Sequence, residues 1–232
     1  MGRPAMHETA RRMDGRPWVY LASESPQRRA ILEELGISYR LLKVDVAEIA
    51  AATSRETVEE NARRKLIAGL KSAEPGAVVI GADTVLEAQG RQLGKPADAT
   101  AAQEYLQMLS GHSAVACSAV AVAVQGAAEG CLATETAEVH FKSLPPDVIR
   151  WYIATREPMG RAGAFGISRL GEILTESLDG GYSCVSGLPK TALLAALTAA
   201  AGAQLPESLR TMPATLWASR VQLCPLRLTP TL

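Results

Sequence analysis

Blocks of apolar and polar residues follow one another along the chain and predict alternating strands and helices. Two short runs rich in strand formers, "WVYLA" and "YRLLKVDV", stand on either side of a helix predicted over Pro26–Leu35. The next helix is the charged segment "RETVEENARRKLIAGLKS". It is followed by "AVVIGADTVLEA", which is nearly all apolar, as expected of a strand that is buried on both faces.

The later segments continue this alternation. "TAAQEYLQMLSG" predicts a helix that ends at a glycine, and "SAVACSAVAVAVQG" and "LATETAEVHFKSL" predict two paired strands joined by a small loop. "PPDVIRWYIAT" and "LPKTALLAALTAAA" predict two helices that begin at prolines. The chain therefore predicts an α/β fold with a mixed sheet flanked by helices.

The two ends of the chain lack this patterning. Residues 1–15 are polar and predict a flexible N-terminal extension. Periodicity is lost again in residues 203–232, which are rich in proline and predict an irregular C-terminal tail that docks through Leu216 and Trp217. The folded domain is therefore expected to span residues 16–202.

Composition narrows the class of protein. Lysine plus arginine and aspartate plus glutamate number 24 each and only 4% of residues are aromatic, so no surface that coats nucleic acid is indicated. The four cysteines are far apart and predict neither a zinc site nor a disulfide framework. No apolar run reaches the ~20 residues of a membrane span, and the N-terminus lacks the apolar core of a signal peptide. We therefore expect a cytoplasmic protein without nucleic-acid or membrane partners.

The start of the first predicted helix is unusually well specified. Ser25 suits the N-cap, Pro26 the first helical position, and Gly36 the position just past the end. The N-terminus of a helix offers free N–H groups to an anion, and Arg28 and Arg29 add positive charge there. On its own the stretch fits an ordinary capped helix carrying surface arginines, with a phosphate site as the alternative.

The segment "VVIGADTVLEAQGRQLGKP" places a carboxylate within an apolar strand. An ionised carboxylate is costly to bury, so Asp83 must be paired, bound to a metal, or placed where the strand borders a cleft. Thr84 adds a hydroxyl, and Lys95 stands on a turn between Gly94 and Pro96. The alternative to a reactive site is a structural ion pair between Asp83 and Lys95.

Other charged residues stand near the ends of predicted elements. Asp45 and Glu48 follow a predicted strand, and Lys65 lies on the charged helix, where most charges form the solvated face. Arg161 lies in "REPMGRAGAFGISRLG", a small-residue loop that either approaches a ligand closely or makes a tight connection. No two of the three histidines share a metal-ligand spacing, and Ser23 lacks the surroundings of a hydrolase nucleophile.

Taken in order, several motifs resemble the Maf family of nucleoside triphosphate pyrophosphatases. They are "LASESPQRRAILEELGI", "VDVAE", "ENARRKL", "GADTVLEAQGRQLGKP", "YLQMLSGHS", "EPMGRAGAFGIS" and "GYSCVSGLPKTAL", which together span roughly Val19–Leu197. Each motif alone is weak, but the ordered set is highly specific. It favours the phosphate-site interpretation of the first helix.

The resemblance implies an elongated mixed sheet with two lobes around a central cleft, and a homodimer. It also implies a divalent metal, Mg²⁺ or Mn²⁺, and cleavage of a nucleoside triphosphate between its α- and β-phosphates. Matched position by position, Asp83 is the expected general base or metal ligand and Glu48 the metal-side glutamate. The residues expected to bind substrate are Ser23, Arg28, Lys65, Thr84, Lys95 and Ser168.

The chain departs from the family pattern where the base is expected to be read. Gln27 and Ser168 replace an arginine and a glutamine typical of the dTTP/UTP branch, whereas Thr84 follows that branch. The "SPQRR" spacing is closer to the 7-methyl-GTP branch, so both substrates stay open. Cys184 stands where asparagine is common. These changes also leave open a non-catalytic nucleotide-binding regulator of growth or division.

Overall fold

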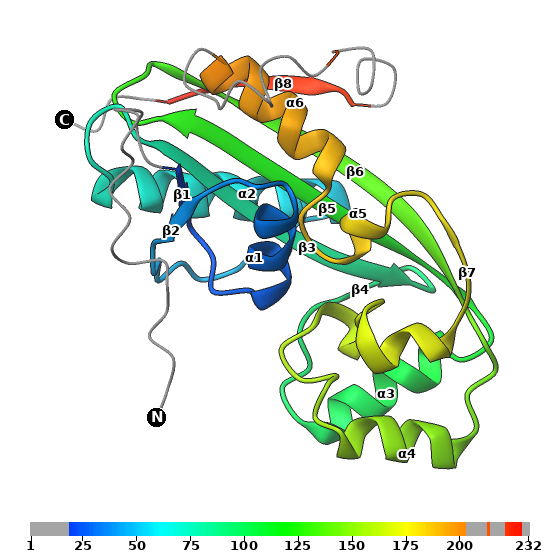
Figure 1. Cartoon of the computed structure of the whole chain (residues 1–232). Coiled ribbons are helices and arrows are strands. Elements are labelled where there is room, and N and C mark those ends of the chain that lie inside the picture. Colours follow the sequence, from blue (N-terminus) through cyan, green and yellow to red (C-terminus); the bar gives the residue numbers. More distant parts are fainter. Residues whose placement is uncertain (1–18, 203–212, 214–220, 229–232) are drawn as a thin grey trace.

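The computed structural model describes residues 19–202, 213 and 221–228 (Figure 1). The predictions for residues 1–15, Leu216 and Trp217 lie outside the described residues. Within the described residues, no helix is both long enough and apolar enough to span a bilayer.

Eight strands of the described chain form one open mixed sheet in the order β2-β1-β3-β5-β6-β7, with β4 paired to β3 and β8 paired to β6. Strand β1 pairs in parallel with β2 and β3, and the other pairs are antiparallel. The strands are β1 (Val19–Leu21), β2 (Tyr39–Leu41), β3 (Val78–Ala88), β4 (Arg91–Leu93), β5 (Ser113–Val124), β6 (Glu129–Phe141), β7 (Thr175–Asp179) and β8 (Leu223–Arg227). The predicted mixed α/β fold is confirmed.

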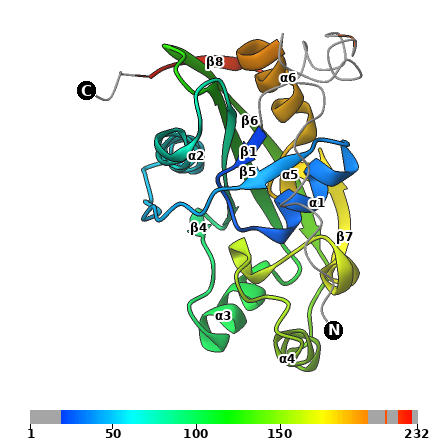
Figure 2. The same cartoon turned by 60° about the vertical axis from the view of Figure 1, so that its left-hand side comes forward.

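Helices flank both faces of this sheet, with α2 on one side and α6 on the other (Figure 2). The α-helices are α1 (Pro26–Glu34), α2 (Ser54–Ser72), α3 (Ala99–Leu109), α4 (Pro146–Ala154), α5 (Tyr182–Val185) and α6 (Lys190–Ala201), and two 3₁₀ turns are η1 (Ala162–Ala164) and η2 (Arg169–Leu174).

Side-chain alternation along the strands divides the core between these two helical layers. Leu21 and Ile80 point to the face covered by α1 and α6, where they pack in a cluster with Leu32 and Leu193. Their neighbours Tyr20 and Val79 point to the opposite face and pack with residues of α2. Because successive residues of a strand face opposite sides, one apolar run fills both cores.

The far end of the long strands carries a separate group of helices. Helices α3 and α4 lie there with η1 and η2, away from α1, α2 and α6 (Figure 1). They have their own buried cluster, which includes Leu106, Leu144 and Tyr152. This arrangement is consistent with the predicted two lobes.

The first helix begins as its sequence predicts. Ser25 is the N-cap, and its side chain accepts a hydrogen bond from the backbone N–H of Arg28. Pro26 is the first helical residue, and Gly36 follows the helix with φ of +66°. This positive φ favours glycine, which has no Cβ to clash.

Four segments differ from the sequence predictions. Strand β2 ends at Leu41, and residues 42–50 have no regular structure. Strand β7 and helix α5 were not expected, because they are short and their patterning is weak. Residues Leu223–Arg227, expected to be irregular, form β8 because β6 offers them backbone partners. Such pairing depends on distant residues and leaves little trace in a short segment.

Candidate active site

A cavity of about 400 Å³ lies beside the middle of β3. Its walls come from the start of α1, the irregular segment after β2, α2, β3, the turn after β4, the loop around η1, and the turn after α5. Every predicted site residue lines it: Ser23, Arg28, Glu48, Lys65, Asp83, Thr84, Lys95 and Ser168. Folding therefore brings together positions that are up to 145 residues apart in the chain (168 − 23).

One end of the cavity is built from alternating charges. The Lys65 ammonium donates to Asp83 Oδ1 at 2.6 Å and to Glu48 Oε1 at 2.8 Å. Lys95 Nζ donates to the same Glu48 oxygen at 2.9 Å. The Lys65 and Asp83 side chains are only 10% and 8% exposed, whereas Glu48 and Lys95 are 41% and 57% exposed. The buried pair thus lies behind an accessible one.

The buried pair depends on a close approach of α2 to β3. Gly81 of β3 lies under α2, and a Cβ at Gly81 would overlap the carbonyl oxygen of Ala62 and the backbone of Leu66. The absence of a side chain at Gly81 lets the helix approach the strand closely. Lys65 can then reach Asp83, two residues further along β3.

Asn61, one helical turn before Lys65, connects Asp83 to the segment that carries Glu48. Its amide nitrogen donates to Asp83 Oδ2 and to the Ile49 carbonyl oxygen, both at 3.0 Å. Its carbonyl oxygen accepts from the Ile49 backbone N–H at 2.9 Å. Ile49 directly follows Glu48, so this one side chain ties the irregular segment to the strand.

The environment of Glu48 holds it as an anion. Partial burial alone would raise its pKa, but hydrogen bonds and charges from Lys65 and Lys95 outweigh that effect and lower the pKa to about 2. A charged Glu48 therefore bridges the ammonium groups of Lys65 and Lys95.

Arg28 is held by three acceptors from different parts of the chain. Its Nε donates to the Gly187 carbonyl oxygen at 2.8 Å, Nη1 to Ser23 Oγ at 3.0 Å, and Nη2 to Thr84 Oγ1 at 3.4 Å. Burial lowers the pKa of Arg28, opposed by the charges of Asp83 and Glu48. An arginine stays protonated under such shifts, so a fixed positive charge faces the cavity.

Two hydrogen-bonded hydroxyl groups continue behind Arg28, those of half-buried Thr84 and buried Ser118. Thr84 Oγ1 and Ser118 Oγ lie 2.8 Å apart, and Ser118 donates to the Cys184 carbonyl oxygen at 2.7 Å. These hydrogen bonds link β3 and β5 to α5 and the turn that holds Gly187. Cys184 itself does not line the cavity, and burial raises the pKa of its thiol to about 12. Its thiol is therefore a packing group at neutral pH.

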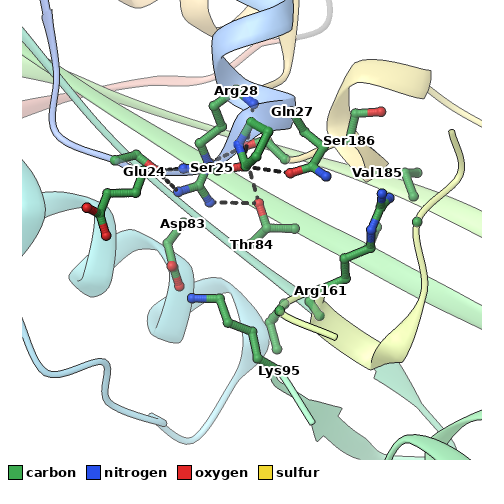
Figure 3. Close-up of a pocket in the computed structure, with 18 of the residues that line it drawn as sticks. Glu24, Ser25, Gln27, Arg28, Asp83, Thr84, Lys95, Arg161, Val185 and Ser186 are labelled. Carbon is green, nitrogen blue, oxygen red and sulfur yellow. Dashed lines mark hydrogen bonds between the residues drawn. The ribbon is translucent and has the colours of Figure 1, made fainter. Parts of the chain in front are cut away.

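The other end of the cavity is apolar and largely uncharged. Phe165, Ile167 and Val185 line it and belong to one buried or half-buried cluster. Arg161 enters from the loop before η1, and Figure 3 shows its side chain directed toward Val185, away from Asp83 and Lys95. Sequence reasoning noted the small residues of this loop but assigned Arg161 no function.

The ion pairs differ from the alternative considered from sequence. Asp83 pairs with Lys65 rather than with Lys95, which pairs with Glu48. Lys65 is buried rather than part of a solvated helix face. Arg29 and Asp45 do not line the cavity. Asn61 and Ser118 were not identified as site residues, although Asn61 stands four residues before Lys65 and so shares its face of α2.

The two carboxylates are a partial donor set for a hard divalent cation. Within the described residues, no group of three or more histidine, cysteine, aspartate or glutamate side chains could hold a metal. Mg²⁺ commonly uses one or two carboxylates, with water and substrate phosphates as its remaining ligands. Glu48 and Asp83 fit that mode of binding, in which phosphate oxygens complete the site.

Comparison with known proteins agrees with this geometry. A family model described as "Maf-like protein" matches residues 18–200. The chain belongs to the Maf family. The match runs from the start of β1 into α6 and so includes every element that lines the cavity.

The relatives of this chain match it over most of their own length. A "dTTP/UTP pyrophosphatase" of Pelotomaculum thermopropionicum is 41% identical over 74% of this chain and 90% of its own. A protein of the same name from Symbiobacterium thermophilum is 40% identical over 74% and 88%. A solved structure of the Staphylococcus aureus Ham1 protein is only 17% identical, with a TM-score of 0.36, over 53% of this chain and 71% of its own.

Proposed function

We propose that this Maf protein hydrolyses a nucleoside triphosphate to the monophosphate and pyrophosphate. The observation that carries the proposal is the meeting of three cationic side chains, Arg28, Lys65 and Lys95, with the carboxylates of Asp83 and Glu48 in one cavity. The name shared by the relatives supports dTTP and UTP over 7-methyl-GTP as substrates.

The triphosphate occupies the charged end of the cavity. Arg28 presents a guanidinium that is already fixed by Ser23, Thr84 and Gly187, so little further ordering is needed when it binds a phosphate. Lys95 is exposed and can exchange its contact with Glu48 for a phosphate oxygen. Positive groups that are in place before the reaction stabilise the charge that develops on the leaving pyrophosphate.

Asp83 is the general base in this proposal. Its carboxylate takes a proton from water while the water oxygen forms a bond to the α-phosphorus. The bond between that phosphorus and the bridging oxygen of the β-phosphate breaks, and pyrophosphate leaves with the bonding electrons. Lys65 and Asn61 hold the two Asp83 oxygens in place during this transfer.

A Mg²⁺ or Mn²⁺ ion is also part of the proposal. Glu48 and Asp83 would hold it, together with oxygens of the triphosphate. When bound, such an ion polarises the phosphoryl group and offsets charge on the substrate. Release of metal by a chelator should therefore abolish turnover, and addition of Mg²⁺ or Mn²⁺ should restore it.

Pyrophosphate release from a panel of canonical and modified nucleoside triphosphates tests the proposal. With Mg²⁺ or Mn²⁺ present, we expect turnover of at least one nucleotide, with the monophosphate as the second product. Absence of turnover for the whole panel by folded protein would contradict the proposal. The cytoplasmic location and the homodimer expected from the resemblance stay predictions.

The non-catalytic alternative relied on Gln27, Ser168 and Cys184. Cys184 lies outside the cavity lining, and Gln27 lies at a distance from Asp83 and Lys95 (Figure 3). Gln27 does replace an arginine, but Arg28, Lys65 and Lys95 still supply three cations to the cavity in which the triphosphate is proposed to bind. Calorimetry that detects nucleotide binding without any product would favour the regulator.

A further inference from the structure

Arg161 is the one cavity-lining cation for which phosphate chemistry has no clear use. Its loop lies across the cavity from α1, and its side chain points to the apolar end (Figure 3). Nη1 donates a hydrogen bond to Ser168 Oγ at 3.4 Å. In the part of the chain that the structure describes, no carboxylate lies within ion-pairing distance of Arg161. The remaining N–H groups of Arg161 are therefore available to a ligand.

The loop reserves space for this guanidinium. A Cβ at Gly166 would overlap the guanidinium group of Arg161, with Cζ at 2.6 Å. The three nearest atoms to such a Cβ all belong to the Arg161 side chain. Gly166 therefore provides the volume in which the end of Arg161 lies.

The loop itself is held firmly to the site. The Gly163 N–H donates to the carbonyl oxygen of Gly94 at 3.0 Å, which joins the loop to the turn carrying Lys95. Ala164 is fully buried with φ of +54°, a conformation that costs free energy in a non-glycine residue. Backbone strain of this kind persists only where the surroundings fix the conformation, so Arg161 projects from a well-determined base.

We propose that Arg161 reads the base of the nucleotide by donating hydrogen bonds to a carbonyl oxygen on its edge. The proposal rests on the proposed function, since it requires that the triphosphate occupy the charged end and the base the apolar end. Flat rings suit the surface formed by Phe165, Ile167 and Val185. Arg161 lies beside that surface and not beside Lys65 or Lys95.

The chemistry of the neighbouring side chains gives Arg161 a selective function. Gln27 and Ser168 can each donate or accept a hydrogen bond, so they can adapt to either kind of base edge. The guanidinium can only donate. Uracil and thymine present a carbonyl oxygen at position 4 of the ring, where cytosine presents an amino group. The carbonyl oxygen at position 2 is common to all three bases, so selection depends on a contact at position 4, where Arg161 favours uracil and thymine over cytosine.

The test compares UTP with CTP, which differ at this edge and share the same triphosphate. We expect the unmodified protein to prefer UTP in kcat/KM. Arg161→Ala should lower the UTP-to-CTP ratio by about tenfold or more, the scale of a lost hydrogen bond to a charged donor. Arg161→Lys, which lacks the planar fork, should fall between the two proteins. An unchanged ratio in Arg161→Ala would overturn the proposal.

Gly166→Ala is an independent variant that leaves Arg161 in the chain. The added methyl group should displace the flexible guanidinium rather than the backbone, so the ratio should fall as in Arg161→Ala. Arg150→Ala removes an exposed arginine of α4 that does not line the cavity, and it should leave the ratio unchanged. Retention of the full ratio in Gly166→Ala would contradict a positioned guanidinium.

Inorganic tripolyphosphate separates a base contact from a phosphate contact. As an inhibitor it should bind Arg161→Ala within about twofold of the unmodified protein, whereas Arg28→Ala should weaken it strongly. An equal weakening in both variants would place Arg161 on the phosphates and overturn the proposal. If no nucleotide is hydrolysed, calorimetric Kd values for UTP and CTP give the same ratio, so the base contact can be judged apart from the reaction.

Discussion

The two ends of the cavity differ in the structure that carries their central side chains. At the charged end, Asp83 lies on a central strand and Lys65 on the helix that packs against it. At the apolar end, Arg161 and Ser168 lie on a loop around η1. Groups on packed helices and strands are held more precisely than groups on loops. The comparison indicates that reaction chemistry is fixed by the scaffold, while base selection can change by substitution in a loop.

The largest effect is expected at the centre of the charged end. Asp83→Asn keeps the shape and removes the charge that a base or metal ligand needs, so kcat should fall at least ~10²-fold. Affinity for the nucleotide should change little or rise, because one negative charge near the triphosphate is lost. Steady-state kinetics and calorimetry check both statements.

Two outcomes of this experiment would count against the assignment. An unchanged kcat would show that Asp83 is not the base. Loss of folding, measured by circular dichroism, would instead indicate that the Lys65–Asp83 pair is structural. Asp45→Asn, at an exposed carboxylate outside the cavity lining, is the matched control.

Arg28→Ala should have the next largest effect. The variant removes a contact that is expected in both the ground state and the transition state, so KM should rise at least as much as kcat falls. A drop of tenfold or more in kcat/KM follows from the loss of a charged hydrogen bond. Arg29→Ala, next to it but outside the cavity lining, should have a much smaller effect. A fall in kcat alone would not fit a phosphate contact.

A change behind the site tests whether the scaffold holds the charges. Gly81→Ala should push α2 from β3, at a cost of about 1–3 kcal/mol in the free energy of unfolding, as for other overpacked cores. Because the Lys65–Asp83 contact spans this interface, kcat should also fall, by less than in Asp83→Asn. Denaturant unfolding followed by kinetics on the folded protein measures both. Full activity and stability would mean that the close approach is dispensable.

The smallest effect is expected from exchanging, rather than removing, side chains near the proposed base site. Ser168→Gln and Gln27→Arg restore side chains of the dTTP/UTP branch, and both positions line the cavity. Each should change the relative kcat/KM of UTP and 7-methyl-GTP by a few fold while kcat for the better substrate stays nearly constant. A large fall in kcat for every nucleotide would contradict the separation of base selection from the reaction chemistry.

Much of the charged end could be predicted from the sequence, because single residues there violate simple rules. A carboxylate in an apolar strand marks Asp83, and a cap followed by proline marks the helix that carries Arg28. The pairing of Asp83 with Lys65 rather than Lys95 was not predictable, because it depends on the packing of α2 over Gly81. The local sequence pattern does not indicate how closely α2 approaches β3.

The apolar end was harder to predict for a physical reason. Arg161 belongs to no periodic pattern. The direction of its side chain depends on the space beside Gly166 and on the hydrogen bond between Gly163 and Gly94. Ser118 is a small residue in an alanine-rich strand, and its hydroxyl gains meaning only when Thr84 and α5 lie beside it. Both features arise from tertiary contacts.

Strand β8 has a consequence for the behaviour of the protein in solution. It lies beyond residues 18–200, and it pairs with Glu129–Ala133 at the edge of β6 that β7 leaves free. An uncovered edge strand offers unpaired N–H and C=O groups to other chains and promotes aggregation. Pro225 within β8 lacks an N–H group, which makes β8 itself a poor template for a further strand. Pairing with β8 therefore leaves fewer backbone groups of β6 available to another chain.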